Sequence, residues 1–158
     1  MITVRTATID DLDGICRIAD EINTLHHEHA PQDFLPANDV TRDRDMWQQA
    51  IEAEDGVLFV ALRDNAVIGF VSAILITNHH ISFLVPKRIC RINSVVVSAT
   101  ERRSGVATQL FAWVESWAKS ESADQLALNV ANWNAGAITF YEQNGFVDIS
   151  RTMVRRLK

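Results

Sequence analysis

An apolar run, a short polar loop and an amphipathic segment follow one another in the second half of the sequence. Residues 92–97 are mainly apolar, and the loop 98–105 leads into a segment whose apolar residues, Leu110 to Trp117, recur at helical spacing. This order predicts a buried strand, a turn and a helix. The first N–H groups of a helix have no partner within it, and the helix dipole adds positive charge there. We therefore expect this loop to bind an anion.

The loop sequence indicates which anion. Gly105 and Ala107 keep the backbone accessible, while Arg102 and Arg103 add full positive charge, a combination that suits a pyrophosphate. A P-loop needs a Gly-Lys pair, which the chain lacks, and a dinucleotide fingerprint needs three glycines after the first strand of its unit. The pattern that remains is R-x-x-G-x-A over residues 102–107. Alone, so short a pattern also fits an ordinary turn between a strand and a helix.

A second strand and helix are predicted about 30 residues further along. Residues 125–130 alternate between apolar and smaller or polar side chains, which predicts a strand. Asn134 is a favourable N-cap, residues 137–141 have helical spacing, and the Asn-Gly pair at 144–145 is a helix stop. The run 134–146 reads N-x-x-A-x-x-F-Y-E-x-x-G-F.

These two signatures, in this order and at this separation, resemble those of the GCN5-related N-acetyltransferase (GNAT) superfamily, closely over residues 92–146. The resemblance implies that the loop holds the pyrophosphate of acetyl-CoA. It also implies that the pantetheine arm pairs with the backbone of residues 95–97, where one N–H polarises the thioester. The cofactor-binding residues implied are Val95, Val96, Val97, Arg102, Arg103, Ser104, Gly105, Val106, Ala107, Thr108 and Asn134.

Tyr141 is the only tyrosine in the chain. It matches the tyrosine that acts in many members of the family as the general acid beside the cofactor sulfur. A phenol with a pKa of about 10 is close enough to a thiol to give up a proton as the thiolate leaves. A tyrosine on a helix can equally be a packed core residue with a satisfied hydroxyl.

The general base is not identified by the sequence. Many members of the family place a carboxylate on the strand before the loop, but here that strand contains Asn93 and Ser94 instead, which suit the positioning of a water. The polar segment 23–38, where the family usually builds its acceptor pocket, offers further candidates: His26, Glu28, His29 and Asp33. The His-His-Glu-His run in this segment lacks the H-E-x-x-H pattern, so we expect no metal.

The whole chain is expected to form a single N-acetyltransferase-like domain over residues 1–158. Its predicted order is β-α-α-β-β-β-α-β-α-β, an α/β (α+β) class with a mixed, mainly antiparallel central sheet and helices on both faces. The predicted strands are 2–7, 57–62, 67–76, 89–97, 125–130 and one or two closing strands in 146–157. The predicted helices are 10–25, 40–54, 106–120 and 134–143. Segments 23–38 and 77–88 are predicted polar connections, and 63–66 a hairpin turn.

Composition narrows the class of function. A net charge of −5 argues against nucleic acid as a partner, and no apolar run is long enough to span a membrane. Two cysteines without metal spacing and no signal-peptide pattern suggest a cytoplasmic protein. The resemblance implies an acetyl-CoA-dependent N-acetyltransferase acting on a primary amine of a small molecule or protein. Its alternatives are a catalytically silent acyl-CoA-binding regulatory module and a nucleotide-binding domain unrelated to CoA. Members of the family are often dimers, so the resemblance also implies a possible homodimer.

Overall fold

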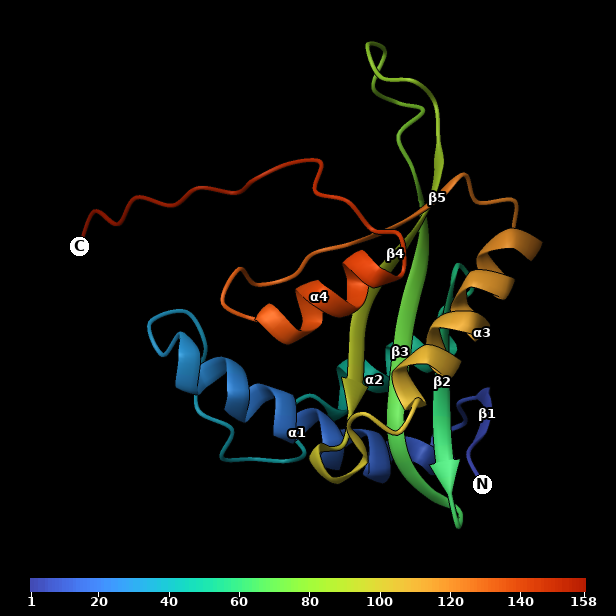
Figure 1. Ribbon diagram of the computed structural model, residues 1–158, viewed down its shortest axis with the longest axis vertical. Helices are drawn as coiled ribbons and strands as arrows, with labels where there is room; N and C mark the ends of the chain where they lie inside the picture. The colour runs from blue at the N-terminus through green and yellow to red at the C-terminus, as the bar shows by residue number, and fades with distance from the viewer. The chain divides into compact units, whose positions relative to one another are not determined.

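A five-stranded sheet is the frame of the computed structural model, which describes residues 1–158 (Figure 1). The strands lie in the order β1-β2-β3-β4-β5, antiparallel except for the parallel pair β4 and β5. Their bounds are β1 Thr3–Thr6, β2 Gly56–Arg63, β3 Ala66–Thr77, β4 Arg88–Val97 and β5 Gln125–Leu128. The contacts divide the chain into two units, Met1–Leu128, which contains the sheet, and Asn129–Lys158. The predicted mixed sheet and its one parallel pair are confirmed.

The helices of the first unit cover both faces of its sheet. They are α1 (Leu12–His29), preceded by a 3-10 turn over Ile9–Asp11, α2 (Arg44–Glu52) and α3 (Val106–Ser120). Alternation along β2 separates the two layers: Leu58 and Val60 point into the core beneath α1 and α2, while Phe59 contacts Trp113 of α3. The second unit contains α4 (Ala135–Gln143).

The turn between β2 and β3 follows the sequence prediction. Asp64 and Asn65 have φ values of +50° and +62°. Positive φ at both central residues gives a two-residue hairpin turn the twist of its strands, and Asp and Asn tolerate this conformation better than most residues. The antiparallel pairing of β2 with β3 continues from Arg63↔Ala66 along both strands.

Three predictions were wrong: the end of the first helix, the bounds of the second, which was expected over 40–54 and spans 44–52, and the closing strands. The helix expected to end near residue 25 continues to His29, so His26, Glu28 and His29 lie on α1 and not in a loop. Nothing in residues 26–29 breaks a helix, and α1 stops at Ala30, directly before Pro31, where a proline disfavours helical backbone. The closing strands expected in 146–157 are absent, because those residues pair with no strand. None of the helices combines the length and the apolar character needed to cross a membrane.

Gly69 of β3 lets α3 approach the sheet closely. A Cβ at this position would lie 2.8 Å from Val106 Cγ1 and 3.0 Å from the carbonyl oxygen of Val96. We predict that Gly69→Ala lowers the free energy of unfolding by about 1–3 kcal/mol, because neither the core valine nor the backbone can move freely. Denaturant titration measures this loss. Gly136→Ala in α4, with no atom within 4 Å of the added Cβ, is the matched control and should cost nothing. Equal effects at the two positions would contradict the packing argument.

Candidate functional site: an anion-binding loop beside a parted strand pair

The start of α3 presents unpaired N–H groups. The first backbone hydrogen bond at this end runs from Gln109 N–H to the carbonyl oxygen of Gly105, at 3.1 Å, so the N–H groups of Val106, Ala107 and Thr108 have no partner within the helix. Gly105 is the N-cap, with φ of +84°, and nothing lies within 4 Å of where its Cβ would be. The space beside the helix start is therefore open, as the sequence predicts.

Positive charge surrounds this helix start. Arg102 and Arg103 are exposed, and neither forms an ion pair. Arg103 has φ of +62°, so the backbone on either side of it turns sharply before Gly105. The macrodipole of α3 adds partial positive charge at the same end. An anion placed here meets backbone donors and two guanidinium groups whose charge no carboxylate neutralises.

Two carboxylates hold the first half of the loop in place. Glu21 of α1 accepts hydrogen bonds from Ser98 Oγ at 3.1 Å and from Ala99 N–H at 2.7 Å. Glu101 accepts two hydrogen bonds from Arg63, at 3.2 and 3.0 Å. Ser98 is buried, and its N–H donates to the carbonyl oxygen of Ile68 at 2.9 Å. The loop is thus fixed to α1, to β3 and to the β2–β3 hairpin before any ligand binds.

Glu21 was missed by the sequence analysis. Its partners are 77 and 78 residues away, and no local pattern distinguishes it from other acidic residues on α1. We predict that Glu21→Ala lowers the free energy of unfolding by about 1–3 kcal/mol, because the buried Ser98 hydroxyl and the Ala99 N–H lose a charged acceptor. Thermal or denaturant unfolding gives the value. Glu28→Ala, an exposed carboxylate on the same helix, should change stability by less than about 0.5 kcal/mol. A Glu21 variant as stable as this control would show that the carboxylate does not hold the loop.

β4 continues beyond the end of β5 toward the loop. They pair from Ile89↔Gln125 to Ile92↔Leu128, and beyond Ile92 the only strand partner of β4 is β3. Asn93 is the extra residue of a bulge, since Ser72 pairs with Ser94 and Ala73 with Ile92. The other edge of residues 93–97 therefore has no strand partner in the sheet, and such an edge is where an extended ligand can add as a strand.

The predicted cofactor residues of β4 differ in how far their side chains are buried. Val96 is buried, and its side chain packs in the core with α1. Val95 and Val97 are half-buried. Because the Val96 side chain is buried in the core, only the main-chain groups of Val96 are available to a ligand. Residues 95–97 are thus a strand edge, and the chain runs from it through the loop into the start of α3.

The second unit holds the remaining predicted residues. Asn134 caps α4 as predicted, its Oδ1 accepting a hydrogen bond from Ala137 N–H at 3.3 Å. Tyr141 is half-buried between Phe140 and Phe146, with ring centroids 5.8 and 5.7 Å away. Burial raises the pKa of the Tyr141 phenol above its ordinary value. The hydroxyl therefore stays protonated at neutral pH, the state that a general acid needs.

The predicted acceptor-side residues lie on α1 and on the bulge of β4. On α1, the Nδ1 atoms of His26 and His29 lie 2.8 and 3.0 Å from the carbonyl oxygens of Ile22 and Leu25. Glu28 is exposed on the same helix, and Asn93 is exposed on the bulge of β4. No three His, Cys, Asp or Glu side chains are placed to hold a metal ion.

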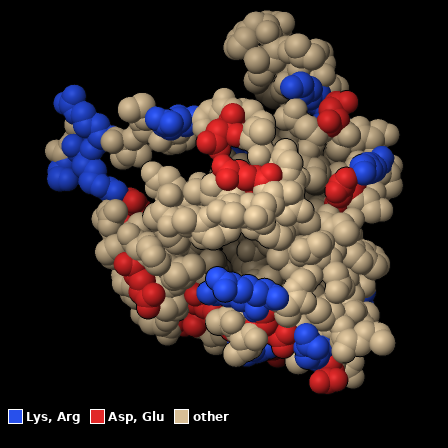
Figure 2. Space-filling model, viewed as in Figure 1, with Lys and Arg blue, Asp and Glu red and all other residues tan.

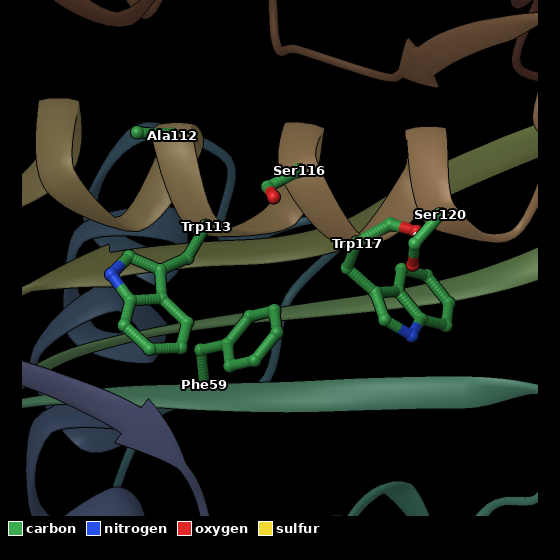
Figure 3. A pocket seen from close by; sticks show the side chains of 6 residues that line it. All are labelled: Phe59, Ala112, Trp113, Ser116, Trp117 and Ser120. Atoms are coloured by element: carbon green, nitrogen blue, oxygen red, sulfur yellow. The ribbon is translucent and has the colours of Figure 1, made fainter.

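A separate hollow of about 410 Å³ lies between α3 and β2. Figure 3 shows Trp113 and Trp117 projecting from α3 toward the sheet, with Phe59 of β2 between them. Ala112, Ser116 and Ser120 complete its lining. None of the sequence-predicted site residues contributes to this hollow, so it is not the candidate site.

The sequence of this chain matches the model of one protein family. A model described as the acetyltransferase (GNAT) family matches residues 22–146, most of the chain, including β4, the loop and α4. The chain belongs to the GNAT acetyltransferase family. The resemblance read from the two signatures is thereby confirmed. Comparison with curated proteins gave no match.

Solved structures share the GNAT fold over nearly the whole chain. The F44R mutant of the BH1408 protein from Bacillus halodurans has a TM-score of 0.93 at 21% identity, covering 99% of each chain. The aminoglycoside N-acetyltransferase AAC(6')-Iy, solved with CoA, has a TM-score of 0.79 at 17% identity, covering 99% of this chain and 94% of its own. A transcriptional regulator from Bacillus halodurans C-125 has a TM-score of 0.76 at 21% identity, covering 99% of this chain and 100% of its own. At these identities the likeness shows the GNAT fold alone.

Proposed function

We propose that this GNAT protein is an acetyl-CoA-dependent N-acetyltransferase, which transfers an acetyl group to a primary amine of a small molecule or a protein. One observation carries the proposal: the open, cationic start of α3 directly follows the part of β4 that has no β5 partner. Acetyl-CoA needs both features, since its pyrophosphate is an anion and its pantetheine arm is an extended chain with amide groups. The complex of AAC(6')-Iy with a bisubstrate analogue of CoA and acetylneamine has this fold and supports the proposal.

In this proposal, acetyl-CoA is bound mainly by the backbone. The N–H groups of Val106, Ala107 and Thr108 hold the pyrophosphate, and Arg102 and Arg103 neutralise its charge. The phosphates approach the backbone of Ser104 and Gly105 closely, because neither residue has a bulky side chain. The edge of residues 95–97 pairs with the pantetheine arm, and one N–H there donates to the thioester oxygen as negative charge builds on it. Asn134 caps α4 and, in this proposal, also forms a hydrogen bond to the pantetheine arm.

The chemistry requires two proton movements. The amine nitrogen forms a bond to the acetyl carbon, the bond from that carbon to sulfur breaks, and the thiolate leaves with a proton. We assign this proton to the Tyr141 hydroxyl, which burial keeps protonated. The proton released by the amine passes to a water held by Asn93, the exposed bulge residue of β4. Glu28 and His29 are the candidates for binding the acceptor amine.

A catalytically silent regulatory module is the second candidate. The β4 strand of this chain carries no carboxylate to accept a proton from the amine, which favours binding without turnover. The fold is also that of a protein described as a transcriptional regulator. Such a module would bind acetyl-CoA at the same loop and change shape or partner, and it would release no CoA thiol.

A screen for thiol release separates the two functions. The purified protein and acetyl-CoA are incubated with aminoglycosides, polyamines, amino acids and a peptide with a free amino group, and the CoA thiol is measured colorimetrically. We expect saturable release with at least one class of amine. Binding of acetyl-CoA without amine-dependent release across all of these classes would favour the silent module.

A further inference from the structure

The loop between β4 and α3 contains a carboxylate, although its proposed ligand is an anion. Three consecutive charged residues lie in the loop: Glu101, Arg102 and Arg103. Figure 2 shows both Lys and Arg atoms and Asp and Glu atoms over the part of the molecule where Figure 1 places this loop. A free carboxylate at Glu101 would repel the phosphates and would compete with them for the neighbouring guanidinium groups. Neither of the two arginines forms an ion pair, so the charge of Glu101 is balanced by another group.

That group is the guanidinium of Arg63, the last residue of β2. Its Nε and Nη2 atoms donate hydrogen bonds to Oε1 and Oε2 of Glu101, at 3.2 and 3.0 Å, so both carboxylate oxygens are engaged. A planar guanidinium matches a carboxylate in this two-pronged geometry, whereas the ammonium of a lysine offers only a point charge. The two side chains are 35% and 20% exposed, so solvent screens this pair less than it screens a fully exposed one.

The backbone of Glu101 connects the two halves of the loop. Its N–H donates a hydrogen bond to the carbonyl oxygen of Ser98 at 2.9 Å, and its carbonyl oxygen accepts one from the Ser104 hydroxyl. Ser104 directly precedes Gly105, the N-cap of α3. The position of Glu101 therefore constrains the residues that lead into the open helix start.

The β2–β3 hairpin in turn fixes the backbone of Arg63. This residue pairs with Ala66 across the two-residue turn, in which Asp64 and Asn65 both have positive φ. So tight a turn leaves the end of the strand little freedom. Arg63 and Glu101 are 38 residues apart in the chain, and Arg63 lies outside both sequence signatures. The pair is thus a contact that only the folded chain reveals.

We propose that Arg63 is a positioning residue for the cofactor, which engages the carboxylate of Glu101 and so keeps the two arginines of the loop available to the phosphates of acetyl-CoA. Arg63 acts through Glu101 and is not itself assigned a contact with the ligand. Because acetyl-CoA is the ligand of the proposed function, this role of Arg63 rests on that proposal. If the role is to balance a charge, removing the charge of Glu101 should make Arg63 dispensable.

Calorimetric titration of acetyl-CoA against three variants tests the proposal. Arg63→Ala should raise the dissociation constant about tenfold or more, because the freed carboxylate repels the phosphates and competes for the arginines. Glu101→Gln keeps the shape of the side chain without its charge and should bind within about threefold of the wild type. The double variant, Arg63→Ala with Glu101→Gln, should also return to within about threefold of the wild type. A loss of affinity caused only by a looser loop would not be rescued in this way, since the glutamine has no guanidinium to hold it.

Arg88→Ala is the matched control for the loss of a paired arginine. Arg88 forms an ion pair with Glu121 at 3.6 Å and lies at the opposite end of β4 from the loop. Its replacement changes the net charge by the same amount, and affinity for acetyl-CoA should stay within about threefold of the wild type. Thermal unfolding checks that each variant is folded. With an amine substrate, Arg63→Ala should raise the KM for acetyl-CoA and leave kcat within about twofold, because the change affects the binding of the phosphates.

Two results would overturn the role of Arg63. One is an Arg63→Ala variant that binds acetyl-CoA as tightly as the wild type, and the other is a double variant as weak as Arg63→Ala alone. Failure of the proposed function is seen separately, in the wild type. If the wild type binds inorganic pyrophosphate but not acetyl-CoA, the proposed function fails, and the same variants titrated with pyrophosphate decide the role of Arg63. A wild type that binds neither ligand would overturn both proposals.

Discussion

The Tyr141→Phe variant should lose most of its turnover and keep its affinity for acetyl-CoA. The substitution removes one oxygen and preserves the ring that packs between Phe140 and Phe146, so stability is expected to change little. Without the hydroxyl, the thiolate must leave unprotonated or take its proton from water. General acid catalysis contributes about 10²–10⁴ in rate, so kcat should fall by roughly that factor while the KM for acetyl-CoA stays within about threefold.

Steady-state kinetics with an amine from the thiol-release screen give both constants. Phe140→Leu is the control for packing, because it alters the aromatic cluster and leaves the hydroxyl in place. Burial raises the pKa of Tyr141 above its ordinary value, so the phenol stays protonated in the wild type and its ionisation should not reduce kcat between about pH 7 and 9. Full turnover by Tyr141→Phe would remove this residue from the acid role and leave the binding proposal intact.

The Ala107→Glu variant should lose binding of acetyl-CoA while remaining folded. A glutamate in the first turn of a helix is favourable for the helix itself, because its charge complements the dipole. The same carboxylate would stand where the proposal places a pyrophosphate, beside the free N–H groups of α3. Like charges brought together at a binding site cost several kcal/mol, so we expect affinity to fall by roughly 100-fold or more.

Ala112→Glu is the matched control for this experiment. It adds the same side chain to the same helix at an exposed position on a later turn. Calorimetric titration should show near-normal affinity for this control, and thermal unfolding should show both variants folded. If Ala107→Glu binds acetyl-CoA as tightly as Ala112→Glu, the start of α3 is not the phosphate site.

Features set by local chemistry could be predicted from the sequence. The cap at Asn134 and the hairpin turn at Asp64-Asn65 each depend on residues a few positions apart. The turn before α3 is of the same kind, because a φ of +84° at the N-cap is a conformation that glycine adopts without strain. The position of the one parallel strand pair follows equally from the order of elements, since a strand–helix–strand connection in a sheet brings the strands side by side.

Features that depend on distant residues could not be predicted. Nothing near Glu21 indicates that it receives hydrogen bonds from Ser98 and Ala99. The end of α1 was placed too early because the polarity of residues 26–29 was interpreted as a loop, although polar residues propagate a helix well enough until Pro31. Residues 146–157 have the alternation of a strand, but they pair with no strand of the sheet.

Calorimetric titration of the folded wild-type protein with acetyl-CoA, with ATP and NAD as controls, tests the central claim most directly. The account predicts saturable binding of acetyl-CoA that exceeds binding of either nucleotide, because the β4 edge selects the pantetheine arm in addition to the phosphates bound by the loop. Equal binding of all three ligands would show that the site binds phosphate groups without selecting the pantetheine arm. No binding at millimolar acetyl-CoA would contradict both the transferase and the silent acyl-CoA module.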